Sequence, residues 1–258
     1  MWLRKAIVAA ALIILPIAAA AQDSKCGGLP LDDSLPKEQR ADLLLKRAVA
    51  CVREGKALQS IALFSELIGL QPNNSTAYLD RGNAYLQTGQ FELGIADFSH
   101  VISVEPKMTE AWYNRGTAFL AARQYERAIA DLGEAIRLKP DFARAYCNRG
   151  FGLMRKSEYD KALADLNTGI EKDPKLSFCH YARGELYFGR GNYKDAIDDI
   201  TIGLRIQPNV QGLIKRGEAY ERLGDREKAL ADFKAALEIT PKSKSAQESV
   251  KRLSGERD

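Results

Sequence analysis

Apolar and small residues recur along most of the chain at the three- and four-residue spacing of helices that are apolar on one face. In residues 109–140, the first such face runs from Trp112 to Phe119. A turn is expected around Arg123, and a second face follows it, made of Tyr125, Ala128, Leu132 and Ala135. Pro140 then ends the second helix, because proline lacks a backbone N–H and cannot continue it. The pattern predicts two helices joined by a short turn.

This two-helix pattern repeats at a fixed period. A proline closes each unit, at intervals of 34 residues and finally 33: Pro72, Pro106, Pro140, Pro174, Pro208 and Pro241. An Arg-Gly pair in the first helix keeps the same spacing, at Arg81, Arg115, Arg149, Arg183 and Arg216. Self-similarity at such a period predicts helix pairs stacked in series. Small residues such as Gly116 and Ala128 would let the two helices of a pair approach closely.

The unit resembles the tetratricopeptide repeat, whose pattern has an aromatic at position 4, small residues at 8, 20 and 27, a bulky residue at 24 and proline at 32. With Thr109 as position 1, the resemblance covers six units, at 41–74, 75–108, 109–142, 143–176, 177–209 and 210–242. The first departs most, with Leu44 in place of the aromatic and Ser60 in place of alanine. The resemblance implies an all-α, right-handed α-solenoid of about six 34-residue helix-turn-helix repeats.

The two ends of the chain differ from the repeats. Residues 1–21 carry Arg4 and Lys5 and then a 16-residue apolar run, Ala6–Ala21, which ends in small residues and predicts a cleaved signal peptide. An uncleaved anchor is the alternative, although the run is shorter than the ~20 residues that span a bilayer. Residues 22–40 form an N-terminal leader.

Residues 243–258 predict a capping helix and tail. Ser245 and Glu248 have the spacing of a capping box, and Ala246, Val250 and Leu253 would lie on one helix face. A helix with one apolar face would cover the last repeat, which would otherwise end in bare apolar surface.

Composition and charge indicate which classes of partner are disfavoured. The formal net charge is +4, and loss of Arg4 and Lys5 with the signal leaves +2, which does not favour nucleic acid or an anionic membrane surface. No membrane span is expected in the mature chain. We expect an exported protein, in a bacterial periplasm or, alternatively, secreted.

If the protein is exported, its four cysteines can form disulfides, because disulfides persist outside the cytosol. A Cys26–Cys51 disulfide would attach the leader to the first repeat. Cys147 and Cys179 lie 32 residues apart, almost one period, and could face each other on neighbouring helices. The stacking of helices does not guarantee the Cα separation that a disulfide requires, so we expect two buried free thiols, with a disulfide as the alternative.

The recurring arginine at position 7 is unusual, because this position usually holds a large apolar residue in the family. A buried unpaired charge costs several kcal/mol, and aspartate recurs at position 23 on the facing helix. We therefore predict structural pairs; an alternative is a row of anion sites. The pairs include Arg81–Asp97, Arg115–Asp131, Arg149–Asp165 and Arg183–Asp199.

The resemblance implies that the first helices of the repeats line a concave groove for a peptide or protein. The groove candidates are Asn83, Tyr113, Asn114, Arg144, Asn148, Phe151, Tyr181 and Glu185. Asparagine can both donate to and accept from a peptide backbone, although aromatics here could instead pack between repeats. Leu79 and Asn148 stand where a chaperone-binding variant of the family has basic residues, so that partner is not expected; a carboxylate near Arg144 remains open.

No catalytic constellation is evident. Of the two histidines, His180 takes the aromatic position 4, where core packing is expected, and a metal or thiol site with Cys147 and Cys179 is a weak alternative. We predict a non-catalytic scaffold or adaptor of the cell envelope that needs no cofactor and holds an extended segment of a partner. The alternatives are an assembly protein that self-associates through its repeat ends, and an accessory subunit that positions an envelope enzyme. The pattern predicts neither the partner nor the oligomeric state.

Overall fold

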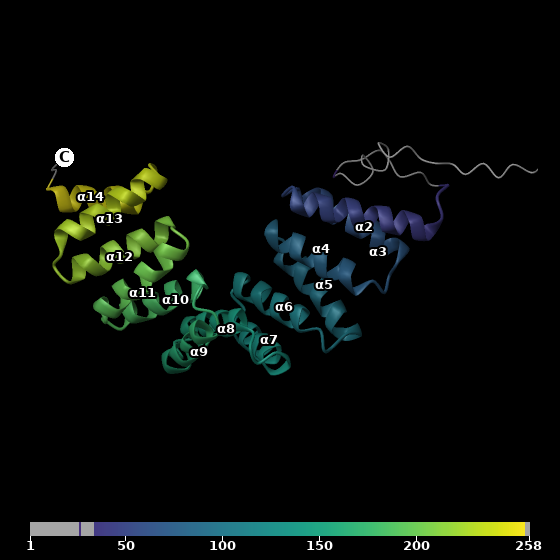
Figure 1. The fold of residues 1–258 in the computed structure, drawn as a ribbon, viewed down its shortest axis with the longest axis horizontal. Helices are drawn as coiled ribbons and strands as arrows, with labels where there is room; N and C mark the ends of the chain where they lie inside the picture. The colour runs from purple at the N-terminus through teal and green to yellow at the C-terminus, as the bar shows by residue number, and fades with distance from the viewer. Residues whose placement is uncertain (1–25, 27–33, 256–258) are drawn as a thin grey trace, which may run out of the picture. The chain divides into compact units, whose positions relative to one another are not determined.

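The computed structural model describes Cys26 and residues 34–255, and the predicted signal peptide lies outside these residues. The described residues form thirteen helices, α2 to α14, and no strand, so the predicted all-α fold is confirmed. The chain divides into two compact units, residues 1–100 and 101–258. Within each unit, consecutive helices lie side by side (Figure 1). No helix among the described residues has the length and apolar character needed to cross a membrane.

The first unit contains α2 (Lys37–Arg53), α3 (Ala57–Leu70), α4 (Ser75–Gln87) and most of α5 (Phe91–Val104). Its core is built on Leu44, Phe64 and Leu67, which are almost completely buried between α2 and α3. The α2 helix begins within the predicted leader, so this helix is longer than the other first helices.

The second unit contains four further helix pairs of the same kind, followed by the capping helix. Its helices are α6 (Thr109–Ala121), α7 (Tyr125–Leu138), α8 (Ala143–Arg155), α9 (Tyr159–Lys172), α10 (Ser177–Gly189), α11 (Tyr193–Ile206), α12 (Val210–Arg222), α13 (Arg226–Ile239) and α14 (Lys244–Ser254). Each of α6 to α13 packs on the next helix, and α14 packs on α13. The result is a series of stacked helix pairs, as in an α-solenoid.

Gly150, at position 8 of the fourth repeat, is required by the close approach of α8 and α9. A Cβ atom added to Gly150 would lie 2.9 Å from the Cγ atom of Leu166 and 3.1 Å from the carbonyl oxygen of Ala162. The backbone oxygen cannot move away as a flexible side chain could. The first and second helices are therefore held at a separation that only a residue without a side chain permits.

Position 15, in the turn between the two helices of a repeat, has a left-handed backbone. Glycine takes this conformation in four repeats, with φ between 70° and 82°, whereas Arg123 has φ 58° and Ser157 has φ 63°. A side chain makes this conformation unfavourable, because Cβ approaches the backbone. The turn geometry is therefore kept in all six repeats even where the residue is ill suited to it.

The capping helix α14 covers the last repeat. Ala246 and Leu253 are buried and join the core formed by Ile214, Phe233 and Ala236. The predicted capping box at Ser245 and Glu248 is wrong. Since the N–H of Gln247 already bonds to the carbonyl of Ser243, the helix begins two residues earlier than that motif requires.

Candidate functional site

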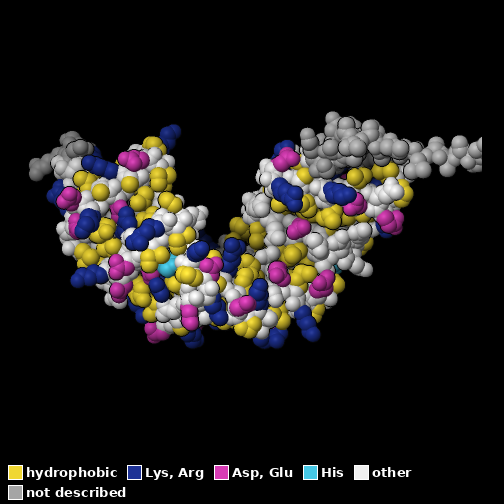
Figure 2. Space-filling model, viewed as in Figure 1, with side chains coloured by type: hydrophobic (Ala, Val, Ile, Leu, Met, Phe, Trp, Pro, Cys, Tyr) yellow, Lys and Arg dark blue, Asp and Glu magenta, His cyan; other side chains and the backbone are white. Residues whose placement is uncertain are grey.

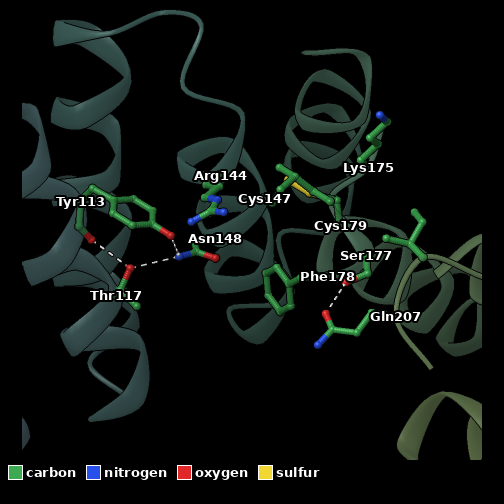
Figure 3. A pocket seen from close by; sticks show the side chains of 12 residues that line it. Tyr113, Thr117, Arg144, Cys147, Asn148, Lys175, Ser177, Phe178, Cys179 and Gln207 are labelled. Carbon is green, nitrogen blue, oxygen red and sulfur yellow. Dashed lines mark hydrogen bonds between the residues drawn. A yellow bond between two sulfur atoms is a disulfide. The ribbon is translucent and has the colours of Figure 1, made fainter. Parts of the chain in front are cut away.

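A pocket of about 590 Å³ in the second unit brings together several of the predicted groove residues. We call it the α8–α10 pocket, because α8 and α10 form most of its wall. Tyr113, Arg144 and Asn148 line it, together with two further first-helix residues, Thr117 and Phe178 (Figure 3). Lys175 and Ile206 also line it and had not been expected there. Lys175 and Ile206 belong to the inter-repeat segments before α10 and at the end of α11, which a rule based on first-helix positions does not cover.

Asn148 is held by α6 and presents one acceptor to the pocket. Its Nδ2 atom donates to the hydroxyl oxygens of Thr117, at 3.0 Å, and Tyr113, at 3.3 Å. The Thr117 hydroxyl already donates to the Tyr113 carbonyl at 2.9 Å, so it can only accept from Asn148. This orients the amide, and Oδ1 points away from α6 (Figure 3). Asn148 thus offers a fixed acceptor, rather than the donor and acceptor pair expected of a free asparagine.

Two positive side chains stand at this pocket without acidic partners. Arg144 and Lys175 are exposed, and neither forms an ion pair with any part of the chain that the structure describes. No aspartate or glutamate is among the described residues that line the pocket. On the face shown in Figure 2, charges of both signs are interspersed over each unit. The α8–α10 pocket is therefore a local positive site on a surface of mixed charge.

An apolar surface adjoins the two cations. Phe178 is 43% exposed and Ile206 is 39% exposed, and both line the pocket. Phe151 contacts Phe178 from the side of the core. Its ring centroid lies 5.8 Å from that of Phe178, and it packs against the buried core cluster of α8 to α10. Phe151 is therefore placed as a packing residue behind the pocket, whereas Phe178 is the aromatic that faces it.

A disulfide between Cys147 and Cys179 forms part of the pocket wall (Figure 3). The expectation of two free thiols is wrong here, since the Cα atoms lie 5.3 Å apart, within the range that a disulfide spans. Both cysteines are almost completely buried. The bond joins α8 to α10 and so links the first helices of two successive repeats.

The second disulfide joins Cys26 to Cys51 of α2, with the Cα atoms 4.6 Å apart. It attaches a residue of the leader to the first helix. No described cysteine is free.

Tyr181 and Glu185 lie in a neighbouring recess of the same unit, which Lys215 also lines. The Tyr181 hydroxyl donates to the carbonyl of Gln207 at 2.7 Å, and its ring packs against the backbone at Gly203 and Gly212. Burial raises the pKa of the Tyr181 hydroxyl. Tyr181 is thus placed as a packing residue between repeats, with Glu185 beside it.

The other two asparagines predicted for the groove, Asn83 and Asn114, do not line the α8–α10 pocket. Asn83, on α4, lines a recess of the first unit with Asp80 and Gln87. Burial raises the pKa of the Asp80 carboxyl above its ordinary value. Asn114, on α6, is half-buried and is not among the residues that line the α8–α10 pocket.

From the second repeat to the sixth, the arginine of position 7 meets the aspartate of position 23 in the same repeat. In every case Nε and Nη2 of the guanidinium donate to the two carboxylate oxygens at 2.6–3.0 Å. The pairs are Arg81–Asp97, Arg115–Asp131, Arg149–Asp165, Arg183–Asp199 and Arg216–Asp232. The hydrogen bond to aspartate raises the pKa of Arg149, although burial acts against it. With both carboxylate oxygens taken, these arginines are placed as cross-links between the two helices.

A third nitrogen reaches the preceding repeat. Nη1 of Arg81 donates to Ser65, that of Arg183 to Asn167, and that of Arg216 to Thr201, at 2.7–3.0 Å. These acceptors all occupy position 25. In the third repeat this position is Gly133, and a Cβ added there would lie 3.6 Å from Nη1 of Arg149.

His180 is a packing residue. Its Nε2 atom lies 3.0 Å from the carbonyl oxygen of Pro174, and its Nδ1 atom lies 3.3 Å from Asp199. Trp112 and Tyr146, which share its position 4, donate to the carbonyls of Pro106 and Pro140 in the same way. In these three repeats, position 4 thus holds a flat side chain that bonds to the carbonyl of the proline before it. The described residues contain no group of three or more side chains able to hold a metal ion.

The fold defines a helical-repeat protein, and the α8–α10 pocket lies between successive repeats of it. Family models described as tetratricopeptide repeat match residues 45–107, 79–141, 113–177 and 210–243. Since these matches cover more than half of the sequence, the chain belongs to the tetratricopeptide repeat family. No curated protein sequence matches it.

Solved structures share the fold at low identity. PilW, described as a widely conserved type IV pilus biogenesis factor, has a TM-score of 0.72 and 18% identity, over 81% of this chain and 98% of PilW. PilF from Pseudomonas aeruginosa has a TM-score of 0.69 and 15% identity, over 82% and 97%. YrrB, described as a TPR protein with an unusual peptide-binding site, has a TM-score of 0.54 and 18% identity, over 73% and 97%. Likeness at these identities shows the fold.

Proposed function

We propose that this protein is a non-catalytic scaffold of the cell envelope that holds an extended segment of a partner protein in the α8–α10 pocket. The observation that carries the proposal is the pocket itself. It combines a fixed hydrogen-bond acceptor on Asn148, two unpaired cations and the exposed ring of Phe178. Polar groups that fix orientation beside an apolar surface are the usual composition of a recognition site.

The family and one structural neighbour support this type of partner. Tetratricopeptide repeat proteins generally bind proteins or peptides, and YrrB is described as having a peptide-binding site. A partner segment in extended conformation exposes its backbone N–H groups, and Asn148 can accept from one of them.

Two features support placement outside the cytosol, in the periplasm. The N-terminal sequence has the organisation of a signal peptide. All four cysteines are joined in disulfides, which persist in oxidising compartments. The structural likeness to PilW agrees with a placement in the cell envelope, because PilW is described as a type IV pilus biogenesis factor.

The proposal is tested by site-specific photo-cross-linking from Phe178. A benzophenone amino acid replaces Phe178 in the full-length protein, expressed in its own host, and Leu223 is the matched control. Leu223 is 45% exposed, against 43% for Phe178, and is not among the residues that line the α8–α10 pocket. We expect a discrete cross-linked partner from Phe178 and none from Leu223. The same set of adducts from both positions, or none from either, would contradict the proposal.

A further inference from the structure

From the unpaired cations of the α8–α10 pocket, we propose that the partner segment is acidic. It is an internal stretch of extended chain that places a carboxylate side chain at Arg144 and Lys175 and an apolar side chain on Phe178. This inference rests on the proposed function and specifies the chemistry of the ligand.

Charge complementarity carries the first step. Some exposed basic side chains of the described residues are paired, as Arg137 is with Glu134 and Lys161 with Glu158, and others, such as Lys242, form no ion pair. Arg144 and Lys175 come from different segments, the first turn of α8 and the turn before α10, yet both line one pocket that contains no acid among its described residues. Two like charges around a recess attract a negative group and disfavour a basic one.

The orientation of the Asn148 amide favours an internal segment of the partner over its free C-terminus. Arg144 and Asn148 are four residues apart on α8, so they are neighbours on one helix face. Both donors of the Asn148 amide point toward α6, and its oxygen points away from α6. A terminal carboxylate beside this oxygen would be repelled, whereas a backbone N–H next to an acidic side chain would be bound.

The apolar requirement comes from Phe178 and Ile206. Both side chains are more than one-third exposed, although they line the same pocket as the buried Cys147 and Cys179. A leucine-sized side chain resting on Phe178 would remove this apolar area from water. Acidic and apolar side chains would therefore have to be close in the partner sequence.

The repeat supplies a matched control for charge. Lys175 directly follows Pro174, and Lys242 directly follows Pro241 in the equivalent turn two repeats later. Lys242 is exposed, forms no ion pair with the described residues and does not line the α8–α10 pocket. Reversal of Lys242 changes the net charge by the same amount as reversal of Lys175 but leaves the pocket unaltered.

The test measures fluorescence anisotropy with labelled peptides whose termini are blocked and whose centre is Glu-Leu-Glu, Gln-Leu-Gln or Glu-Gly-Glu between Gly-Ser flanks. At low salt we expect Glu-Leu-Glu to bind roughly tenfold more tightly than either of the other peptides. Arg144→Glu and Lys175→Glu should each weaken its binding by about tenfold, whereas Lys242→Glu should leave it within about twofold. Circular dichroism confirms that each variant is folded.

Three results would overturn the inference. These are equal binding of Glu-Leu-Glu and Gln-Leu-Gln, an equal loss in Lys242→Glu and Lys175→Glu, and binding that requires an unblocked C-terminus. A partner cross-linked from Phe178 together with any of these would leave the proposed function in place and remove only the acidic ligand. No cross-link and no peptide binding would remove both.

Discussion

The guanidinium of Arg149 and the carboxylate of Asp165 are joined by two parallel hydrogen bonds, from Nε to Oδ2 at 2.7 Å and from Nη2 to Oδ1 at 2.8 Å. Arg149 lies on α8 and Asp165 on α9, so the pair cross-links the two helices of one repeat. The same pair recurs in every repeat from the second to the sixth. A bidentate pair of this kind is stronger than a single ionic contact and has a defined geometry.

Asp165→Ala should lower the free energy of unfolding by about 2–3 kcal/mol, because it leaves a half-buried guanidinium without its acceptors. Denaturant unfolding followed by circular dichroism measures this value. Asp160→Ala is the control, since Asp160 also pairs with an arginine, Arg190, but its side chain is 93% exposed. A loss at Asp165 no larger than that at Asp160 would show that the pair does not stabilise the fold.

Gly133→Ser should stabilise the protein by about 1 kcal/mol, from a better helix propensity and a new acceptor for Nη1 of Arg149. Other repeats have Ser65, Asn167 or Thr201 at this position, each accepting from the equivalent arginine. Gly133→Ala provides the propensity gain without an acceptor. Since alanine is the better helix former, a serine variant at least as stable as the alanine variant indicates the hydrogen bond. A clearly less stable serine variant would argue against it.

Ser157→Gly should raise the stability by about 1 kcal/mol, because glycine adopts the left-handed backbone of this turn without strain. The φ angle of Ser157 is 63°, close to that of the glycines at the equivalent position. Thermal unfolding is a suitable measurement, with Gly191→Ser as the reciprocal change. Gly191 has φ 80°, and we expect that substitution to destabilise. Opposite signs in the two variants would confirm the role of the backbone, and equal signs would refute it.

Replacing Cys147 and Cys179 together by alanine should lower the free energy of unfolding by about 3–4 kcal/mol, as expected for a disulfide that closes a loop of this length. The double variant removes the bond without leaving a reactive thiol. Chemical denaturation with and without a reductant measures the loss. In the variant, the reductant should no longer change the stability through the bond between α8 and α10. A wild-type protein insensitive to reductant, with a variant of equal stability, would contradict the expectation.

Much of the fold follows from the residues in order along the chain. The 34-residue period of proline and Arg-Gly, with apolar faces such as Trp112 to Phe119, is enough to predict paired helices and their number. These are local patterns, because the helix periodicity, the proline that ends each repeat and the small residues at helix contacts all lie within one repeat. The pairing of Arg149 with Asp165 was also expected, because a charge at a position facing another helix requires a partner there.

The site was less predictable, for a physical reason. Asn148 was expected to both donate and accept, but its donors are held by Thr117 and Tyr113 from another helix. Phe151 packs behind the pocket, while Phe178 is the ring exposed in it. The Cys147–Cys179 disulfide depended on whether two helices bring the Cα atoms within 5.3 Å. A repeating sequence establishes which residues share a helix face, because that depends on neighbours in the chain. Which hydrogen-bond donors remain available, and which rings remain exposed, depends on how successive repeats pack together in three dimensions.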